Sequence, residues 1–177
     1  MGWTPRLELI EQGSGRRIEF PVERLFNDWY AGRDQAAVWK HVEELAEIGV
    51  PAPTRTPTLY ALGNYLATTA DSIQVQHDKT SGEVEYVLFV GPDESYVTVG
   101  SDHTDRELES RSVEWSKQSY PDLFGAKPHH VVLMSGTVPS LGGISYADGY
   151  DLELHDPVLG RTIRHSYRVD VLRHKIT

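Results

Sequence analysis

The chain has 177 residues, of which 39% are hydrophobic and 10% aromatic, a composition typical of one globular domain. Seventeen lysines and arginines against 26 aspartates and glutamates give a net charge of −9, which disfavours nucleic acid as a partner because its phosphates are also negative. Cysteine is absent, no apolar run reaches the ~18 residues of a membrane span, and the first residues lack signal-peptide features. We therefore expect a cytoplasmic protein without disulfides, thiolate metal sites or a membrane partner.

The first seventy residues predict a hairpin, a helix and a stiff loop. Segments 7–10 and 16–20 flank a short glycine-containing turn at 12–15, as in a β-hairpin. Asp34 is a potential N-cap for a helix that reaches about Ile48, because apolar residues recur at helical spacing there. Gly49 and Pro51 end this helix, and the extended loop that follows carries further prolines.

From Ile73 onward, the apolar pattern predicts mainly strands. The candidate strands are segments 73–76, 83–90, 95–99, 131–134, 150–154 and 161–172. Turn residues at 91–94, 148–149 and 156–160 separate several of these segments, and a weak helical pattern covers 108–117. We therefore expect an α+β fold that is mainly β, with one or two helices packed outside.

Glu83 and Glu85 are two residues apart in a predicted strand, so their side chains project from the same face. Carboxylates placed so close together repel each other unless a cation lies between them, and hard divalent cations bind carboxylate oxygen. This spacing makes the pair a candidate metal site. Taken alone, the pair is also compatible with a solvated strand face, which is the common environment of acidic residues.

Asp102 follows a predicted strand in the polar run 100–106. Polar side chains at such positions are often functional, because loops on a rigid scaffold carry much of protein chemistry. Asp102 or Thr104 could instead cap the next helix. The two interpretations do not exclude each other.

His41 and Glu44 share one face of the predicted helix, being three residues apart. A carboxylate beside an imidazole raises its basicity and fixes its tautomer, as a general base requires. Lys117 could hold a substrate carboxylate or a developing oxyanion if it lies near a metal. The ordinary alternatives are a surface pair on a helix and a solvated lysine.

Taken in chain order, these motifs resemble those of the fumarylacetoacetate hydrolase superfamily. That superfamily has a His-x-x-Glu segment near prolines, a Glu-x-Glu strand, an Asp followed by an Arg, a lysine before an aromatic-rich loop, and a Gly-Thr turn. The corresponding segments are His41-Val42-Glu43-Glu44, Gly49-Val50-Pro51-Ala52-Pro53, Glu83-Val84-Glu85, Ser101-Asp102 with Arg106, Lys117 and Gly136-Thr137. Segments 99–106 and 156–165 are also similar to an uncharacterised bacterial branch of the superfamily.

The resemblance implies one domain over residues 1–177, folded as a mixed β-sandwich roll. Residues 1–70 would contribute the hairpin, a helix that acts as a mobile lid, and the proline loop, and residues 71–177 the β-roll with the metal site. Members of the superfamily are usually dimeric, so we also expect a homodimer.

The resemblance also assigns roles to individual residues. Mg or Mn would be bound by Glu83, Glu85 and Asp102. His41 and Glu44 would be catalytic and move the proton. Lys117 would be both catalytic and substrate-binding, and the remaining substrate-binding residues would be Arg106 and Thr137.

The implied activity is that of a divalent-metal-dependent hydrolase or lyase on a small oxo-acid or dicarbonyl acid, by C–C cleavage, decarboxylation or tautomerisation. The chain departs from the superfamily in four respects. The separation of Glu85 and Asp102 is shorter than in most members, Ser101 replaces the usual Asn, and Leu62 stands where many members have a lysine. In addition, only residues 118–135 connect Lys117 to Gly136, where other members carry a longer stretch. The shortening keeps a second hypothesis open, in which the same scaffold is a non-catalytic binding or structural module. The sequence names neither the substrate nor the choice between Mg and Mn.

Overall fold

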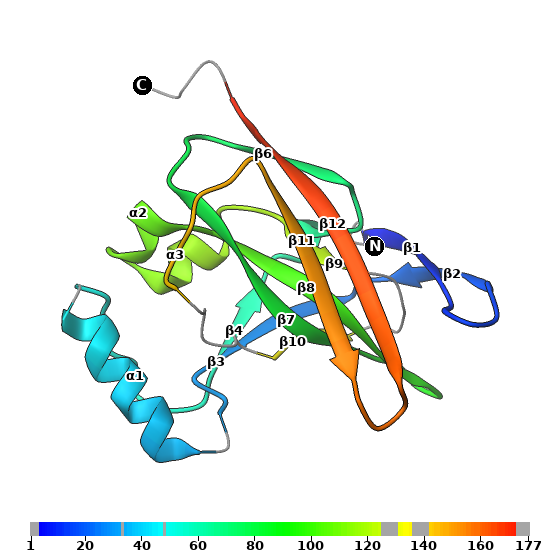
Figure 1. Ribbon diagram of the computed structural model, residues 1–177, viewed down its shortest axis with the longest axis horizontal. Coiled ribbons are helices and arrows are strands. Elements are labelled where there is room, and N and C mark those ends of the chain that lie inside the picture. Colours follow the sequence, from blue (N-terminus) through cyan, green and yellow to red (C-terminus); the bar gives the residue numbers. More distant parts are fainter. Residues whose placement is uncertain (1–3, 33, 48, 125–130, 136–141, 173–177) are drawn as a thin grey trace.

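The computed structural model describes residues 4–32, 34–47, 49–124, 131–135 and 142–172, which form three sheets and a few short helices (Figure 1). The hairpin predicted at the start of the chain is present as strands β1 (Arg6–Ile10) and β2 (Arg17–Pro21). The largest sheet has seven strands. From one edge to the other they are β4 (Thr58–Leu62), β3 (Arg24–Trp29), β10 (Val131–Met134), β7 (Thr80–Val90), β8 (Ser95–Asp105), β9 (Asp122–Phe124) and β5 (Ala67–Thr68). The third comprises β11 (Gly149–Asp156), β12 (Arg161–Val171) and β6 (Ser72–Val75). The expectation of a mainly β fold with few helices is confirmed.

The hairpin of β7 and β8 is the centre of this architecture. Its two strands of 11 residues pair along their whole length, from Thr80 opposite Asp105 to Val90 opposite Ser95. The hairpin of β11 and β12 crosses it, as Figure 1 shows. The prediction that Asp102 follows a strand is wrong, because β8 continues past Val99 to Asp105. The polar second half of β8 stays in the sheet because each of its residues is paired with a residue of β7 in the strand ladder.

The helix predicted from Asp34 to about Ile48 is confirmed as α1 (Gln35–Glu47). Asp34 caps its first turn by accepting hydrogen bonds from the backbone N–H groups of Ala36 and Ala37, at 3.0 and 3.2 Å. Val38 and Val42 are buried against the aromatic pair Trp29 and Tyr30 and against the start of α3. The helix is therefore attached to the rest of the protein by one narrow apolar stripe.

The helix predicted at 108–117 is two short helices, α2 (Arg106–Glu109) and α3 (Val113–Lys117). Asp105 caps the first and Ser112 caps the second, so the chain starts a new helix after one turn. A 3-10 turn, η1 (Asn64–Leu66), precedes β5. Among the described residues, no helix has both the length and the apolar character needed to cross a membrane.

A polar junction joins the third sheet to the central hairpin. The hydroxyl of Tyr167 on β12 is 3.0 Å from Ser101 Oγ and 2.9 Å from His103 Nδ1, and His103 Nε2 is 3.0 Å from Thr80 Oγ1. Burial lowers the pKa of His103 to about 4, so the imidazole is neutral at neutral pH. Gly82 lies against the same hydroxyl, and a Cβ there would come within 2.2 Å of it. The close approach of the two sheets therefore requires glycine at this position.

We predict that Tyr167→Phe lowers the free energy of unfolding by about 1–3 kcal/mol, because Ser101 and His103 would be left buried without their shared partner. Chemical denaturation followed by fluorescence measures the change. The matched control is Tyr65→Phe. The Tyr65 side chain is exposed, so this replacement should change the free energy of unfolding little. Equal stability of Tyr167→Phe and the wild type would contradict the structural role of the junction.

Candidate metal centre

Three carboxylates project from one face of the central hairpin. The strand register places Glu83 opposite Asp102, and Glu85 follows Glu83 by two residues on β7. One oxygen of each carboxylate lies within 4.8 Å of the corresponding oxygens of the other two. Glu85 and Asp102 are buried, and the Glu83 side chain is only 13% exposed. The structure thus brings together the three residues that the sequence singled out as a metal site.

A buried lysine lies directly on this acidic group. Lys117 Nζ donates a hydrogen bond to Asp102 Oδ2 and is 3.7 Å from Glu83 Oε2, and its side chain has no exposed surface. Burial by itself lowers the pKa of Lys117, but the neighbouring carboxylates outweigh burial and raise the pKa above its ordinary value. The ring centroid of Trp29 is 5.3 Å from the same ammonium group. Lys117 is therefore a fixed positive charge held by carboxylates and one aromatic face.

Asn27 contacts the acidic group from β3, a strand that is not paired with β8. Its Nδ2 donates to Asp102 Oδ2 at 3.2 Å, while its Oδ1 is buried and has no hydrogen-bond partner among the described residues. Asn27 is on β3, which β10 and β7 separate from β8 in the sheet order. Neighbouring strands are ~4.8 Å apart, so three strand spacings would put these groups far apart in a flat sheet. The contact shows that the sheet curves strongly around the site.

Arg106 neutralises part of the same charge. Its Nη1 is 2.7 Å from Glu83 Oε1 and 2.8 Å from Glu109 Oε2, and its Nε donates to Ser81 Oγ at 2.7 Å. Only 8% of the Arg106 side chain is exposed. The sequence suggested Arg106 as a substrate-binding residue, and in the structure its visible contacts orient Glu83. Glu109 was not singled out from the sequence, and burial raises its pKa although Arg106 opposes the rise.

Asp122 is a further carboxylate that sequence reasoning did not identify. On β9 the register pairs Ser101 with Leu123, and continuing it by one residue places Asp122 opposite Asp102. Asp122 is 0% exposed, its side chain meets that of Asp102, and neither of its oxygens accepts a hydrogen bond from an N–H or hydroxyl donor among the described residues. Burial, followed by the negative charge of Asp102, raises the pKa of Asp122 well above its ordinary value.

The charges at this site do not balance. Two cations, Arg106 and Lys117, face the three carboxylates of Glu83, Glu85 and Asp102, before Glu109 and Asp122, whose pKa values burial raises, are counted. Buried negative charge is costly unless it is paired or coordinates a metal. An added divalent cation would offset the excess, and carboxylate oxygen is the ligand that Mg and Mn prefer. The donor set therefore fits such an ion.

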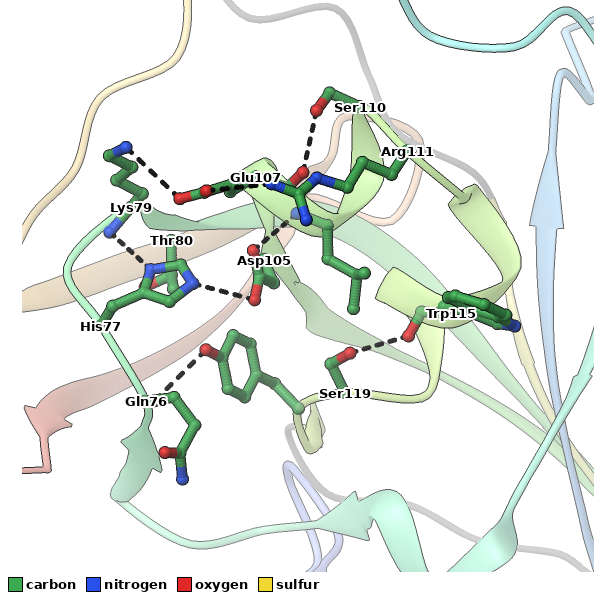
Figure 2. A network of polar contacts seen from close by, with 12 residues as sticks. Gln76, His77, Lys79, Thr80, Asp105, Glu107, Ser110, Arg111, Trp115 and Ser119 are labelled. Carbon is green, nitrogen blue, oxygen red and sulfur yellow. Dashed lines mark hydrogen bonds and ion pairs between the residues drawn. The ribbon is translucent and has the colours of Figure 1, made fainter. Parts of the chain in front are cut away.

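The helix that carries Arg106, α2, is fixed to the end of β8 by a polar network, and α3 with Lys117 follows it directly (Figure 2). Asp105 accepts the backbone N–H of Leu108 and its Oδ2 lies 3.0 Å from His77 Nε2. Glu107 pairs with Lys79 at 3.3 Å and with Arg111 at 3.4 Å. The network holds Arg106 in position from outside the acidic group.

His41 and Glu44 lie on the surface of α1. Their side chains are 48% and 57% exposed, and His41 Nδ1 is 3.8 Å from Glu44 Oε2. The described contacts connect them to the acidic group through aromatic rings. The ring centroid of Tyr30 is 6.4 Å from that of His41 and 4.5 Å from that of Trp29, which faces Lys117. The predicted pair is thus found on the predicted helix face, beside the site and not within it. Thr137 lies outside the described residues.

A family model described as "Protein of unknown function (DUF2848)" matches residues 29–129 and 124–167, most of the chain, and the chain belongs to this family. No curated protein sequence matches the chain. Among solved structures, a fumarylpyruvate hydrolase from Pseudomonas aeruginosa, in complex with Mn²⁺ and pyruvate, has a similar fold. Its TM-score is 0.57 at 14% sequence identity, and the alignment covers 97% of this chain and 99% of that chain. At the level of the fold, this likeness supports the resemblance drawn from the sequence.

We predict that Lys117→Met destabilises the chain by about 3–5 kcal/mol without divalent cations, because Asp102 and Glu83 would lose their buried cation. Added Mn²⁺ should stabilise this variant more than the wild type, since the ion would supply the missing positive charge. Thermal unfolding with and without Mn²⁺ measures both effects. The control is Lys40→Met on α1, where the replaced side chain is 77% exposed. Equal losses of stability in the two variants would contradict the role given to Lys117.

Proposed function

We propose that this member of the DUF2848 family is a divalent-metal-dependent hydrolase or lyase that acts on a small oxo-acid or dicarbonyl acid. The observation that carries the proposal is the group of Glu83, Glu85 and Asp102, whose oxygens lie within 4.8 Å of one another. The excess of negative charge around this group supports a divalent ion there. The solved neighbour, a hydrolase in complex with Mn²⁺ and pyruvate, supports the choice of an oxo-acid substrate.

Mg or Mn would be held by Glu83, Glu85 and Asp102. Such an ion polarises the oxo group of an acid and stabilises the negative charge that develops when a neighbouring bond breaks. Three carboxylates leave coordination positions for a substrate on an ion that takes six ligands. Arg106 and Asn27 would orient Glu83 and Asp102, the two ligands that they contact.

The remaining roles fall to side chains around the acidic group. Lys117, already on Asp102 and Glu83, would steady the substrate carboxylate as a cation enclosed in the site. His41 would accept and return the proton, with Glu44 raising its basicity and holding its tautomer. Because the pair lies on an exposed face of α1, this helix would act as the lid. Substrate contacts by Arg106 and Thr137 belong to the same proposal.

The wider organisation is also part of the proposal: one domain with the mixed β-sandwich roll of the fumarylacetoacetate hydrolase superfamily, cytoplasmic and paired as a homodimer. An apolar strip on the outer face of the central hairpin supports a second copy as the partner. Its residues are exposed by 38–47%, namely Val84, Tyr86, Val90 and Val97.

The second candidate function is a non-catalytic binding or structural module on the same scaffold. The short connection of residues 118–135 between Lys117 and Gly136 supports this candidate. Substrate-facing groups would be lost with the missing stretch. The metal ligands and the His41–Glu44 pair precede it, so a module of this kind would still bind the ion.

The first test is titration calorimetry of Mn²⁺ and Mg²⁺ with the wild type and with Glu85→Gln. We expect the wild type to bind one ion per chain and Glu85→Gln to lose most of the affinity, because a neutral amide replaces a buried ligand charge. The fold of the variant is checked by circular dichroism. A wild type that binds neither ion would overturn the proposed site.

Turnover separates the two candidate functions. A panel of oxo-acids, including oxaloacetate and acylpyruvates, is assayed with Mn²⁺. We expect His41→Ala to lose turnover by about 10²–10⁴-fold while Mn²⁺ affinity is kept, because the imidazole moves the proton and does not bind the ion. The matched control is Glu43→Gln, an exposed carboxylate on the same helix that is adjacent to Glu44. Metal binding without turnover of any of these acids would favour the module.

A further inference from the structure

Asp122 is a fully buried carboxyl group at the edge of the acidic group. It is 0% exposed and lies against the carboxyl group of Asp102, and neither of its oxygens accepts a hydrogen bond from an N–H or hydroxyl donor among the described residues. A buried polar group without a partner costs a substantial part of the stability of a domain. Such a group calls for an explanation, and an ion or ordered water is one of the few available.

The position of Asp122 points to the metal centre. Its place on β9, opposite Asp102 in the strand register, puts it at the end of a row that runs Glu83, Asp102, Asp122 across three adjacent strands. On the other side of Asp102, Oδ1 of Asn27 is a second buried oxygen without a partner. Two independent groups of unsatisfied oxygens therefore flank the same candidate ligand.

The neighbouring cations do not satisfy these oxygens. The ammonium of Lys117 donates to Asp102, and Arg106 contacts Glu83, Glu109 and Ser81. Among the described residues, the acids whose oxygens meet within 4.8 Å are Glu83, Glu85 and Asp102. Asp122 is thus adjacent to the ligand group without being a member of it.

We propose that Asp122 is a positioning residue of the metal centre, an acceptor for water bound to the divalent ion. Hard divalent ions keep water ligands, and these waters donate strong hydrogen bonds to nearby carboxylates. A hydrated ion would give the oxygens of Asp122 the donors that the neighbouring carboxyl group of Asp102 does not supply. This inference rests on the proposed metal site and adds a residue to it from a strand that carries no ligand.

The experiment compares Asp122→Asn with the wild type by Mn²⁺ calorimetry and by thermal unfolding without metal. We expect the variant to bind Mn²⁺ about 10–100-fold more weakly, as is typical when a partner behind a metal site is removed. Without metal its melting temperature should stay equal or rise, because a neutral amide replaces a buried acid beside the carboxylate of Asp102. A structural role predicts the reverse, with lower stability and unchanged affinity. If Asp122→Asn does not fold, Asp122→Ser is measured in the same way.

The matched control is Thr98→Val. Thr98 is also fully buried on β8 and its Oγ1 lacks a hydrogen-bond partner among the described residues, but it lies opposite Val87 and outside the acidic group. It should keep both its stability and its Mn²⁺ affinity, so weaker binding is expected at position 122 and not at position 98. Suppose that the wild type binds Mn²⁺ tightly and Glu85→Gln loses this affinity. Unchanged Mn²⁺ affinity in Asp122→Asn would then overturn this inference and leave the proposed metal site intact. A wild type that binds no ion would overturn both.

Discussion

The structure depends on how one buried patch of negative charge is compensated. Glu83, Glu85 and Asp102 are brought together by strand pairing, and carboxylates in such an array repel one another. The described cations that contact them, Lys117 and Arg106, come from the short helices that follow β8 directly. Caps and ion pairs around Asp105 and Glu107 fix the first of those helices. Strand β8, which contributes Asp102 to the acidic group, thus leads directly into the helices α2 and α3, which carry the compensating cations.

Strand β8 serves the metal centre and the junction between sheets at the same time. Because successive side chains alternate between faces, Asp102 projects to the acidic group while Ser101 and His103 project to the opposite face. There they meet the hydroxyl of Tyr167. The close packing of the third sheet therefore holds the same residues whose neighbours form the site. Asp102, the candidate metal ligand on this strand, is held in place by hydrogen bonds that its neighbours Ser101 and His103 make on the opposite face of the sheet.

Sequence patterns within one segment predicted its secondary structure well. They did not predict contacts between strands that are far apart in the sequence. The cap at Asp34 and the helical spacing after it predicted α1, and the spacing of Glu83 and Glu85 predicted that they share a face. Strand β3 was missed because Asn27 interrupts its buried apolar face. Asn27 and Asp122 become part of the site only through sheet curvature and the pairing of the short strand β9. Neither has a sequence neighbour that would reveal its burial.

Trp29 connects the two parts of the proposed machinery. The Trp29 ring lies near the ammonium group of Lys117 and also belongs to the apolar cluster in which α1 buries Val38 and Val42. A divalent ion on Asp102 and Glu83 would compete with Lys117 for the same oxygens, because like charges cannot share them without cost. Any displacement of Lys117 would act directly on the Trp29 ring, which lies in the cluster that α1 packs against. The candidate metal site and α1 thus share one contact residue, so a change at one would reach the other without a longer path through the fold.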